Sequence, residues 1–206
     1  MKSAKNLLEQ LKSLPYFTKE SVLQLSRPYG LAKTTVDTYI SRSMKRKDIL
    51  SLRRGLYVSA DFYNKNKSDT SYLFFLANVI RKPSYVSSWA ALQYYGLATE
   101  AIHTITSVTS KVTRTYVTKA GNFVYSSIKD ELFSDSVLIK GKFDFFIATP
   151  AKALFDLLYA KTRQFQGVAF EHIPRLVEEL RIDIDEMDKS EREKFYMMVK
   201  KYTHHG

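Results

Sequence analysis

The apolar residues between positions 26 and 58 recur at two different spacings. In the first part they fall every three or four residues, which is the spacing of one face of a helix. The residues on that face are Val36, Tyr39, Ile40 and Met44. The opposite face is hydroxylic and basic, and it carries Thr35, Thr38, Arg42 and Lys45. The pattern predicts an amphipathic helix that packs through its apolar face, with Thr34 as N-cap and Asp37 completing a capping box.

Two short β-like runs follow this helix and its basic end, Lys45-Arg46-Lys47. They cover residues 49–52 and 56–58, and Arg53-Arg54-Gly55 joins them. Glycine permits a tight turn there, so we expect both arginines at the tip of a hairpin. A polar, cationic helix followed by such a hairpin is typical of a winged helix-turn-helix, in which the helix enters the major groove of DNA. The alternative is an ordinary amphipathic helix with a solvated charged face.

Two shorter helices are predicted ahead of this element. Leucines at helical spacing run from Leu7 to Leu14 and stop at Pro15, and Thr18 is placed to cap a second helix over residues 19–25. Three helices and a hairpin thus fill residues 1–62, which we predict to be a DNA-binding domain. Residues 63–70 lack apolar periodicity and are predicted to be a linker.

Residues 71–206 alternate between helical and β-branched segments. Helices are predicted over residues 70–80, 88–95, from Thr149-Pro150 onward, 174–180 and 188–202. Strands are predicted over residues 85–87, within 102–118, and over 123–126, 137–140 and 143–148. A mixed sheet with helices on it is expected, so the chain is assigned to the α+β class, with a C-terminal mixed α/β domain.

The positive charge is concentrated in the first third of the chain. The formal net charge is +11, and residues 1–67 hold 14 Lys and Arg against 5 Asp and Glu, a net of +9. Cations that replace condensed counterions supply most non-specific affinity for duplexes, so double-stranded DNA is the expected partner. No lipidation signal, signal peptide or long apolar run favours a membrane, and we expect a cytoplasmic protein. The chain has no cysteine, which excludes disulfides and thiolate zinc sites.

A secondary basic patch is expected around the threonine-rich strands of the second domain. Its members are Lys82, Lys111, Arg114 and Lys119. These side chains would extend a DNA footprint, contact a toxin or RNA, or simply be solvated.

No motif for catalysis is found. The 7 glycines form neither a P-loop nor a GxGxxG motif, and the four histidines form no HExxH motif. Lys152 and Asp156 lie one helical turn apart and predict an intrahelical ion pair. We therefore expect a protein without enzymatic activity, cofactor or metal.

Several motifs in this chain resemble those of AbiEi-type antitoxins from bacterial type IV toxin–antitoxin systems. They are RRGLYV at residues 53–58, YVSSWAALQYYGL at 85–97, ITSVT at 105–109 and IATPAKALFD at 147–156. The last resembles the family's IATPEKALLD, with Ala151 where an acidic residue is common. The resemblance covers about residues 5 to 165, and the helices after it match nothing in the family.

The resemblance implies a winged-helix domain followed by an antitoxin domain. It also implies an autoregulating repressor that binds inverted repeats in its own operon promoter. The family counteracts a nucleotidyltransferase-like toxin without a stable complex, in abortive infection of phage-infected cells. A monomer that loads cooperatively onto DNA is expected.

For such a repressor, base edges would be read by Lys33, Thr34, Thr35, Thr38 and Arg42. Phosphates would be held by Lys45, Arg46, Lys47, Arg53 and Arg54. The alternatives are a protein- or RNA-interaction module, or an ATP-dependent modifier of the toxin.

Overall fold

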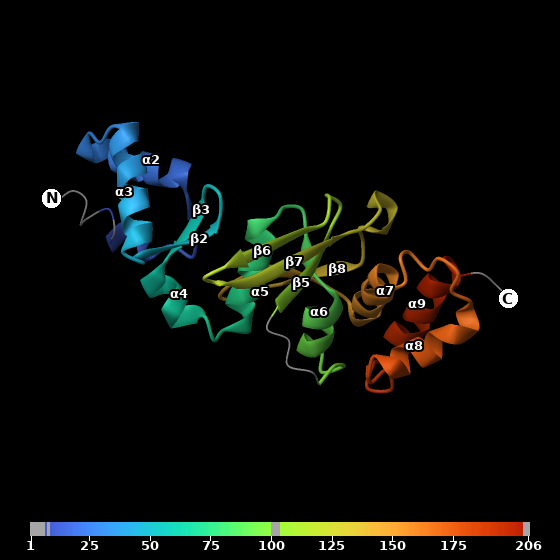
Figure 1. The fold of residues 1–206 in the computed structure, drawn as a ribbon. Coiled ribbons are helices and arrows are strands. Elements are labelled where there is room, and N and C mark those ends of the chain that lie inside the picture. Colours follow the sequence, from blue (N-terminus) through green and yellow to red (C-terminus); the bar gives the residue numbers. More distant parts are fainter. Residues whose placement is uncertain (1–6, 8, 100–103, 204–206) are drawn as a thin grey trace.

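The computed structural model describes residue 7 and residues 9–99 and 104–203. It contains two β-sheets, which lie one after the other along the chain (Figure 1). The small N-terminal sheet lies at one end of the view, the larger sheet lies in the middle, and the last helices lie at the other end. Helices and two sheets together confirm the α+β class. Among the described helices, none has the length and apolar composition needed to cross a bilayer.

The N-terminal part is a three-stranded antiparallel sheet with helices on it. Its elements are β1 (Phe17–Thr18), α2 (Lys19–Ser26), the 3-10 helix η1 (Arg27–Tyr29), α3 (Lys33–Lys45), β2 (Ile49–Arg53), β3 (Leu56–Ser59) and α4 (Ala60–Asn66). The strand order is β1-β3-β2. The expected cap of α2 is confirmed, because Thr18 Oγ1 accepts a hydrogen bond from the amide of Ser21 at 3.1 Å.

The hairpin β2–β3 contributes side chains to two hydrophobic clusters. Ile49 belongs to the N-terminal core together with Val36 and Ile40 of α3. Leu52 and Leu56 point the other way and belong to the main core of the chain. Successive side chains of a strand alternate between faces, so one hairpin can serve two cores.

The start of α3 differs from the prediction. The N-cap is Ala32, which provides no side-chain hydrogen bond, and Thr34 lies inside the first turn. Asp37 therefore cannot complete a capping box, and it instead pairs with Lys19 Nζ at 2.5 Å. Gly30 adopts φ +62 and ends η1. This turn lets α3 begin at Lys33, earlier than it would with Thr34 as its N-cap.

Residues 63–70, which the sequence predicted to be a linker, are largely helical. Helix α4 runs to Asn66, and only residues 67–69 separate it from the next helix, which Asp69 caps. Asn66 is buried, and its side-chain oxygen accepts a hydrogen bond from Lys142 Nζ at 2.7 Å. The polar composition concealed this helix because most polar residues of α4 are exposed: Asp61, Asn64 and Lys65.

The larger sheet has six strands in the order β6-β7-β5-β4-β9-β8. Its strands are β4 (Tyr85–Val86), β5 (Thr104–Thr109), β6 (Arg114–Thr118), β7 (Gly121–Ser127), β8 (Ser136–Ile139) and β9 (Phe145–Ala148). The helices are α5 (Thr70–Ile80), α6 (Ser88–Tyr94), α7 (Pro150–Lys161), α8 (Ile173–Glu179) and α9 (Lys189–Lys200), with 3-10 turns η2 (Asp130–Leu132) and η3 (Phe170–His172). The pairs β5–β7 and β4–β9 are parallel and the others antiparallel, so the expected mixed sheet is confirmed.

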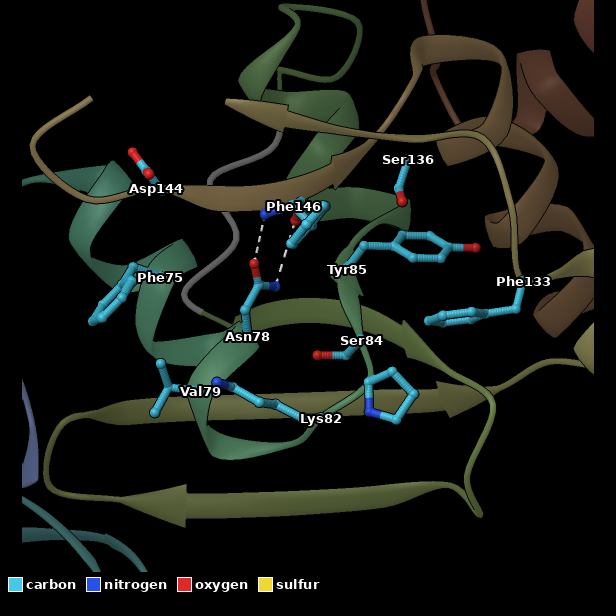
Figure 2. Close-up of a pocket in the computed structure, with 11 residues that line it drawn as sticks. Phe75, Asn78, Val79, Lys82, Ser84, Tyr85, Phe133, Ser136, Asp144 and Phe146 are labelled. Carbon is cyan, nitrogen blue, oxygen red and sulfur yellow. Dashed lines mark hydrogen bonds between the residues drawn. The ribbon is translucent and has the colours of Figure 1, made fainter. Parts of the chain in front are cut away.

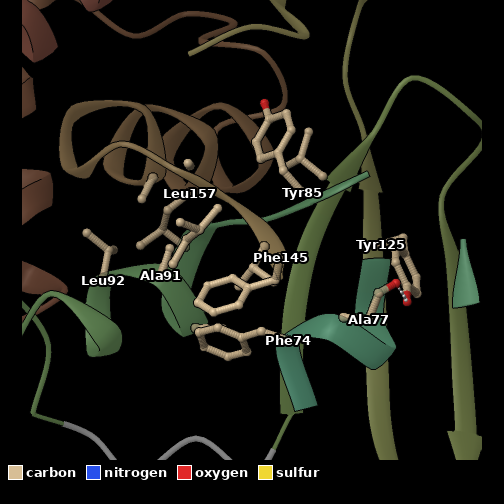
Figure 3. Close-up of a cluster of buried hydrophobic side chains, with 14 of the residues drawn as sticks. Phe74, Ala77, Tyr85, Ala91, Leu92, Tyr125, Phe145 and Leu157 are labelled. Atoms are coloured by element: carbon tan, nitrogen blue, oxygen red, sulfur yellow. Dashed lines mark hydrogen bonds between the residues drawn. The ribbon is translucent and has the colours of Figure 1, made fainter. Parts of the chain in front are cut away.

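Aromatic and aliphatic side chains join this sheet to its helices (Figure 3). Phe74 of α5 meets Phe145 of β9 with ring centroids 5.3 Å apart. The hydroxyl of Tyr125 donates a hydrogen bond to the carbonyl of Ala77 at 2.7 Å. Strand β9 also bonds to α5, since the side-chain oxygen of Asn78 accepts a hydrogen bond from the amide of Phe146 at 2.6 Å. This side chain thus supplements the pairing of β9 with the short strand β4.

The last helix is tied to the loop before β8 by an ion pair between Lys194 Nζ and Asp135, 2.9 Å apart. Partial burial raises the pKa of Asp135, but hydrogen bonds from Lys194 and Ser134 outweigh it, so the pKa lies below its ordinary value. A carboxyl with a lowered pKa in the folded state stabilises the fold above its unfolded pKa of about 3.9, and this contribution is lost as the pH falls.

We expect Asp135→Asn to lower the free energy of unfolding at pH 7 by about 0.2–1 kcal/mol, because the pair is only partly buried. Asparagine tolerates the φ of +55 at this position, so the backbone is not strained by the change. Urea unfolding at a series of pH values should show the two proteins converging below about pH 4. A difference that stays constant down to pH 3 would contradict this account.

Candidate nucleic-acid interface

Helix α3 presents a polar, cationic face to solvent. Val36 and Ile40 are buried on its inner side, as predicted, whereas Tyr39 and Met44 are only half-buried against the same cluster. The side chains expected to read bases are all exposed: Lys33, Thr34, Thr35, Thr38 and Arg42. The structure therefore brings the predicted reading residues together on one helix and leaves them accessible.

The first turn of α3 has no side-chain cap. The first amides of a helix have no intrahelical acceptor, and they carry the positive end of the helix dipole. Lys33 and Thr34, which are exposed, stand at this end. An uncapped helix start beside a lysine is suited to binding a phosphate group. The sequence did not predict this feature, because its pattern indicated Thr34 as the cap.

The hydroxyl of Thr38 is already engaged within the helix. Its Oγ1 donates a hydrogen bond to the carbonyl of Thr34 at 3.0 Å. Thr38 can therefore offer a base edge its acceptor lone pairs and its methyl group, but not a free donor. Arg42 is exposed and makes no ion pair within the described part of the chain, which makes it the strongest donor of this face.

The basic residues at the end of α3, Lys45, Arg46 and Lys47, differ in their contacts. Arg46 Nε donates to Asp48 at 2.8 Å, so part of its charge is neutralised within the protein. Lys45 and Lys47 are exposed, and among the described residues neither has an acidic partner. These two lysines are the better candidates for phosphate contacts.

The two hairpin arginines have different surroundings, which the sequence did not predict. Gly55 adopts φ +78 and closes the turn, as expected. Arg53, however, points to the main domain, where its Nε donates to the carbonyl of Ile80 at 2.8 Å. Arg54 is exposed and is free of such a contact in the described residues. Arg53 is also exposed, but its guanidinium connects the hairpin to the end of α5, so we expect Arg54 to be the stronger phosphate ligand of the two.

We expect the variants Arg54→Ala and Arg53→Ala to behave differently on DNA. Loss of one phosphate contact at Arg54 should reduce the slope of log affinity against log salt by about 0.9. Arg53→Ala should leave the slope nearly unchanged and should lower the free energy of unfolding by about 1 kcal/mol, since a hydrogen bond from a charged group is lost. Gel-shift salt titrations and urea unfolding distinguish these effects. An equal change of slope in both variants would restore Arg53 as a phosphate ligand.

The secondary basic patch lies along β6. Its members Lys82, Lys111, Arg114 and Lys119 are all exposed. Lys111 Nζ donates to the carbonyl of Lys82 at 2.6 Å, so these two lysines adjoin. The opposite end of β6, with Lys119, faces β2 across a cleft of about 500 Å³ that Met44 of α3 also lines. The patch therefore begins next to the C-terminal end of α3 and follows an edge strand of the larger sheet.

A buried polar network lies at the start of α7, and it contains more residues than the ion pair predicted from the sequence. Lys152 and Asp156 do form an ion pair one turn apart, but both side chains are fully buried. Ser87 Oγ donates to Asp156 at 2.6 Å and the hydroxyl of Tyr85 donates to it at 3.2 Å. Burial raises the pKa of Asp156, and the Lys152 charge and these hydroxyls offset part of that effect. The network joins α7 to β4 and to Ser87, which directly follows β4, and all four side chains are buried.

A second unpredicted contact holds the beginning of α7. Glu191 of α9 accepts a hydrogen bond from the amide of Ala151 at 2.9 Å, while Thr149 caps the same helix. In the described residues, three or more histidine, aspartate or glutamate side chains nowhere gather as a metal site would require.

Comparison with models of known protein families gives no match for this chain, and comparison with curated proteins gives none either.

Proposed function

We propose that this protein is a sequence-specific DNA-binding repressor of the antitoxin kind, and that its N-terminal part acts as a winged helix-turn-helix. The observation that carries the proposal is the exposed face of α3, which combines hydroxyls, an uncapped first turn and Arg42, which forms no ion pair among the described residues. In this proposal α3 lies in the major groove, and Lys45, Lys47 and Arg54 contact phosphates on either side.

Two further observations support a DNA footprint that is larger than α3. The net charge of residues 1–67 is +9, which favours a polyanion. The secondary basic patch begins beside the end of α3 and would meet the backbone of a duplex that continues past the helix. Binding, rather than catalysis, is proposed for both surfaces.

The test is a gel shift with the DNA upstream of the protein's own reading frame. We expect this duplex to bind at least about 1,000-fold more tightly than a scrambled duplex of the same length. Sedimentation of the complex should show more than one chain on an inverted repeat. Equal affinity for both duplexes would remove the repressor proposal and would favour a protein- or RNA-interaction module.

The antitoxin activity rests on the sequence resemblance and is tested separately. Co-expression with the neighbouring toxin gene should restore growth, without a complex that survives purification. Growth that is not restored by the wild-type protein would remove the antitoxin activity and would leave DNA binding untouched.

A further inference from the structure

A cavity of about 650 Å³ lies beside the short strand β4, between α5 and the hairpin β8–β9. Volumes of this size are typical of small-molecule sites. Figure 2 shows four aromatic rings around it, from Phe75, Tyr85, Phe133 and Phe146. Phe146 is 46% exposed although it is a large apolar side chain on a strand. The cavity thus offers flat apolar walls and an open side.

One buried polar group in the wall has no partner. Ser84 lines the cavity and is only 8% exposed, yet its Oγ makes no hydrogen bond within the described part of the protein. A buried hydroxyl without a partner costs free energy, and such groups are uncommon in folded proteins. A bound molecule with a polar edge would satisfy it.

Two charged side chains of opposite sign complete the lining. Lys82 and Asp144 are both exposed, and Figure 2 shows them set apart. One oxygen of Asp144 accepts from the amide of Gly141 at 2.9 Å, which fixes the carboxylate, and both oxygens keep lone pairs that can accept hydrogen bonds from a ligand. Within the described residues, neither side chain belongs to an ion pair.

We infer that this cavity binds a purine nucleotide with a guanine base, stacked among the aromatic rings and hydrogen-bonded to Asp144 and Ser84, with its phosphate toward Lys82. Every base can stack on an aromatic side chain, so the rings alone do not discriminate between guanine and adenine. A carboxylate accepts from the two adjacent N–H groups of guanine, whereas adenine presents a ring acceptor that the carboxylate repels. The ammonium of Lys82 attracts the phosphate.

Isothermal titration of the full chain with guanosine and adenosine 5′-monophosphates tests the inference. We expect the guanine nucleotide to bind at least about tenfold more tightly, which is the discrimination of one bidentate contact. Asp144→Asn should bring the two affinities within about twofold of each other, because an amide lacks the charge that repels adenine and accepts fewer hydrogens. This variant keeps an oxygen for the Gly141 amide, so the local fold is retained.

Lys82→Gln should weaken both nucleotides by a similar factor and leave guanosine, which has no phosphate, unchanged. Glu186→Gln is the matched control, an exposed carboxylate that is outside the lining and should alter nothing. Amide signals of Ser84 and Phe146 should shift in the nitrogen–proton spectrum on titration. No binding of either nucleotide at millimolar concentration, equal binding of both, or shifts confined to α3 would each overturn the inference.

Discussion

Asp156→Ala should lower the free energy of unfolding by about 3–5 kcal/mol, the largest effect that we expect of any single substitution in this chain. The variant leaves the ammonium of Lys152 in the interior with no carboxylate, since both side chains are fully buried. It also leaves the hydroxyls of Ser87 and Tyr85 without their acceptor. Urea unfolding at pH 7, followed by circular dichroism, measures the loss.

The pair Arg175 and Glu179 provides a matched control. It has the same spacing of four residues along a helix and a distance of 3.0 Å, but both side chains are exposed. Glu179→Ala should therefore change the free energy of unfolding by no more than about 0.5 kcal/mol. Lys152→Met combined with Asp156→Leu removes both charges and should be more stable than Asp156→Ala alone. A double variant that is less stable than the single variant would contradict an uncompensated charge as the cause.

Arg42→Ala should weaken binding to the protein's own promoter DNA by about 1–3 kcal/mol and leave binding to a random duplex nearly unchanged. The reason is that Arg42 is exposed, forms no ion pair in the described part of the chain, and lies on the face of α3 that the proposal places in the major groove. Gel shifts at one fixed salt concentration on both duplexes measure the ratio. A parallel loss on both duplexes would show that this face contacts only phosphates.

Two variants control for charge and for the neighbouring hydroxyl. Arg175→Ala removes an exposed arginine of α8, far from α3 in Figure 1, and should leave both affinities unchanged. Thr38→Val keeps the shape of the side chain but removes its bond to the carbonyl of Thr34. Because the hydroxyl donor is already used within the helix, this change should cost less than Arg42→Ala.

Element types were largely predictable from the sequence because periodicity and capping report local structure directly. The helix over residues 70–80 agrees with α5, and Thr149-Pro150 begins α7 as expected. The predicted start of α3 was wrong by two residues, since several polar residues there could each have capped it and the preceding turn decided the outcome. The strands of the larger sheet were found, but their order depends on contacts between distant segments that no local pattern encodes.

The candidate sites were predictable only where one segment carries them. The exposed face of α3 follows from helical spacing alone. The different contacts of Arg53 and Arg54 do not, because the carbonyl that binds Arg53 belongs to Ile80, 27 residues later. The same holds for Asp156, whose acceptor role depends on Tyr85 and Ser87, about 70 residues earlier, and for the cavity around Ser84, which is lined by residues as far apart in the chain as 75 and 146.

The hairpin that serves two cores has a practical consequence for dissecting this protein. A fragment that stops at residue 62 would expose Leu50, Leu52 and Leu56 to water, because their cover comes from the rest of the chain. Such a fragment should aggregate or need solubilising substitutions at these leucines, even though its sequence contains every helix of the proposed reader. Cutting the chain at residue 62 is thus a poor route to a minimal DNA-binding fragment. Transplanting α3 alone onto another protein scaffold is more promising.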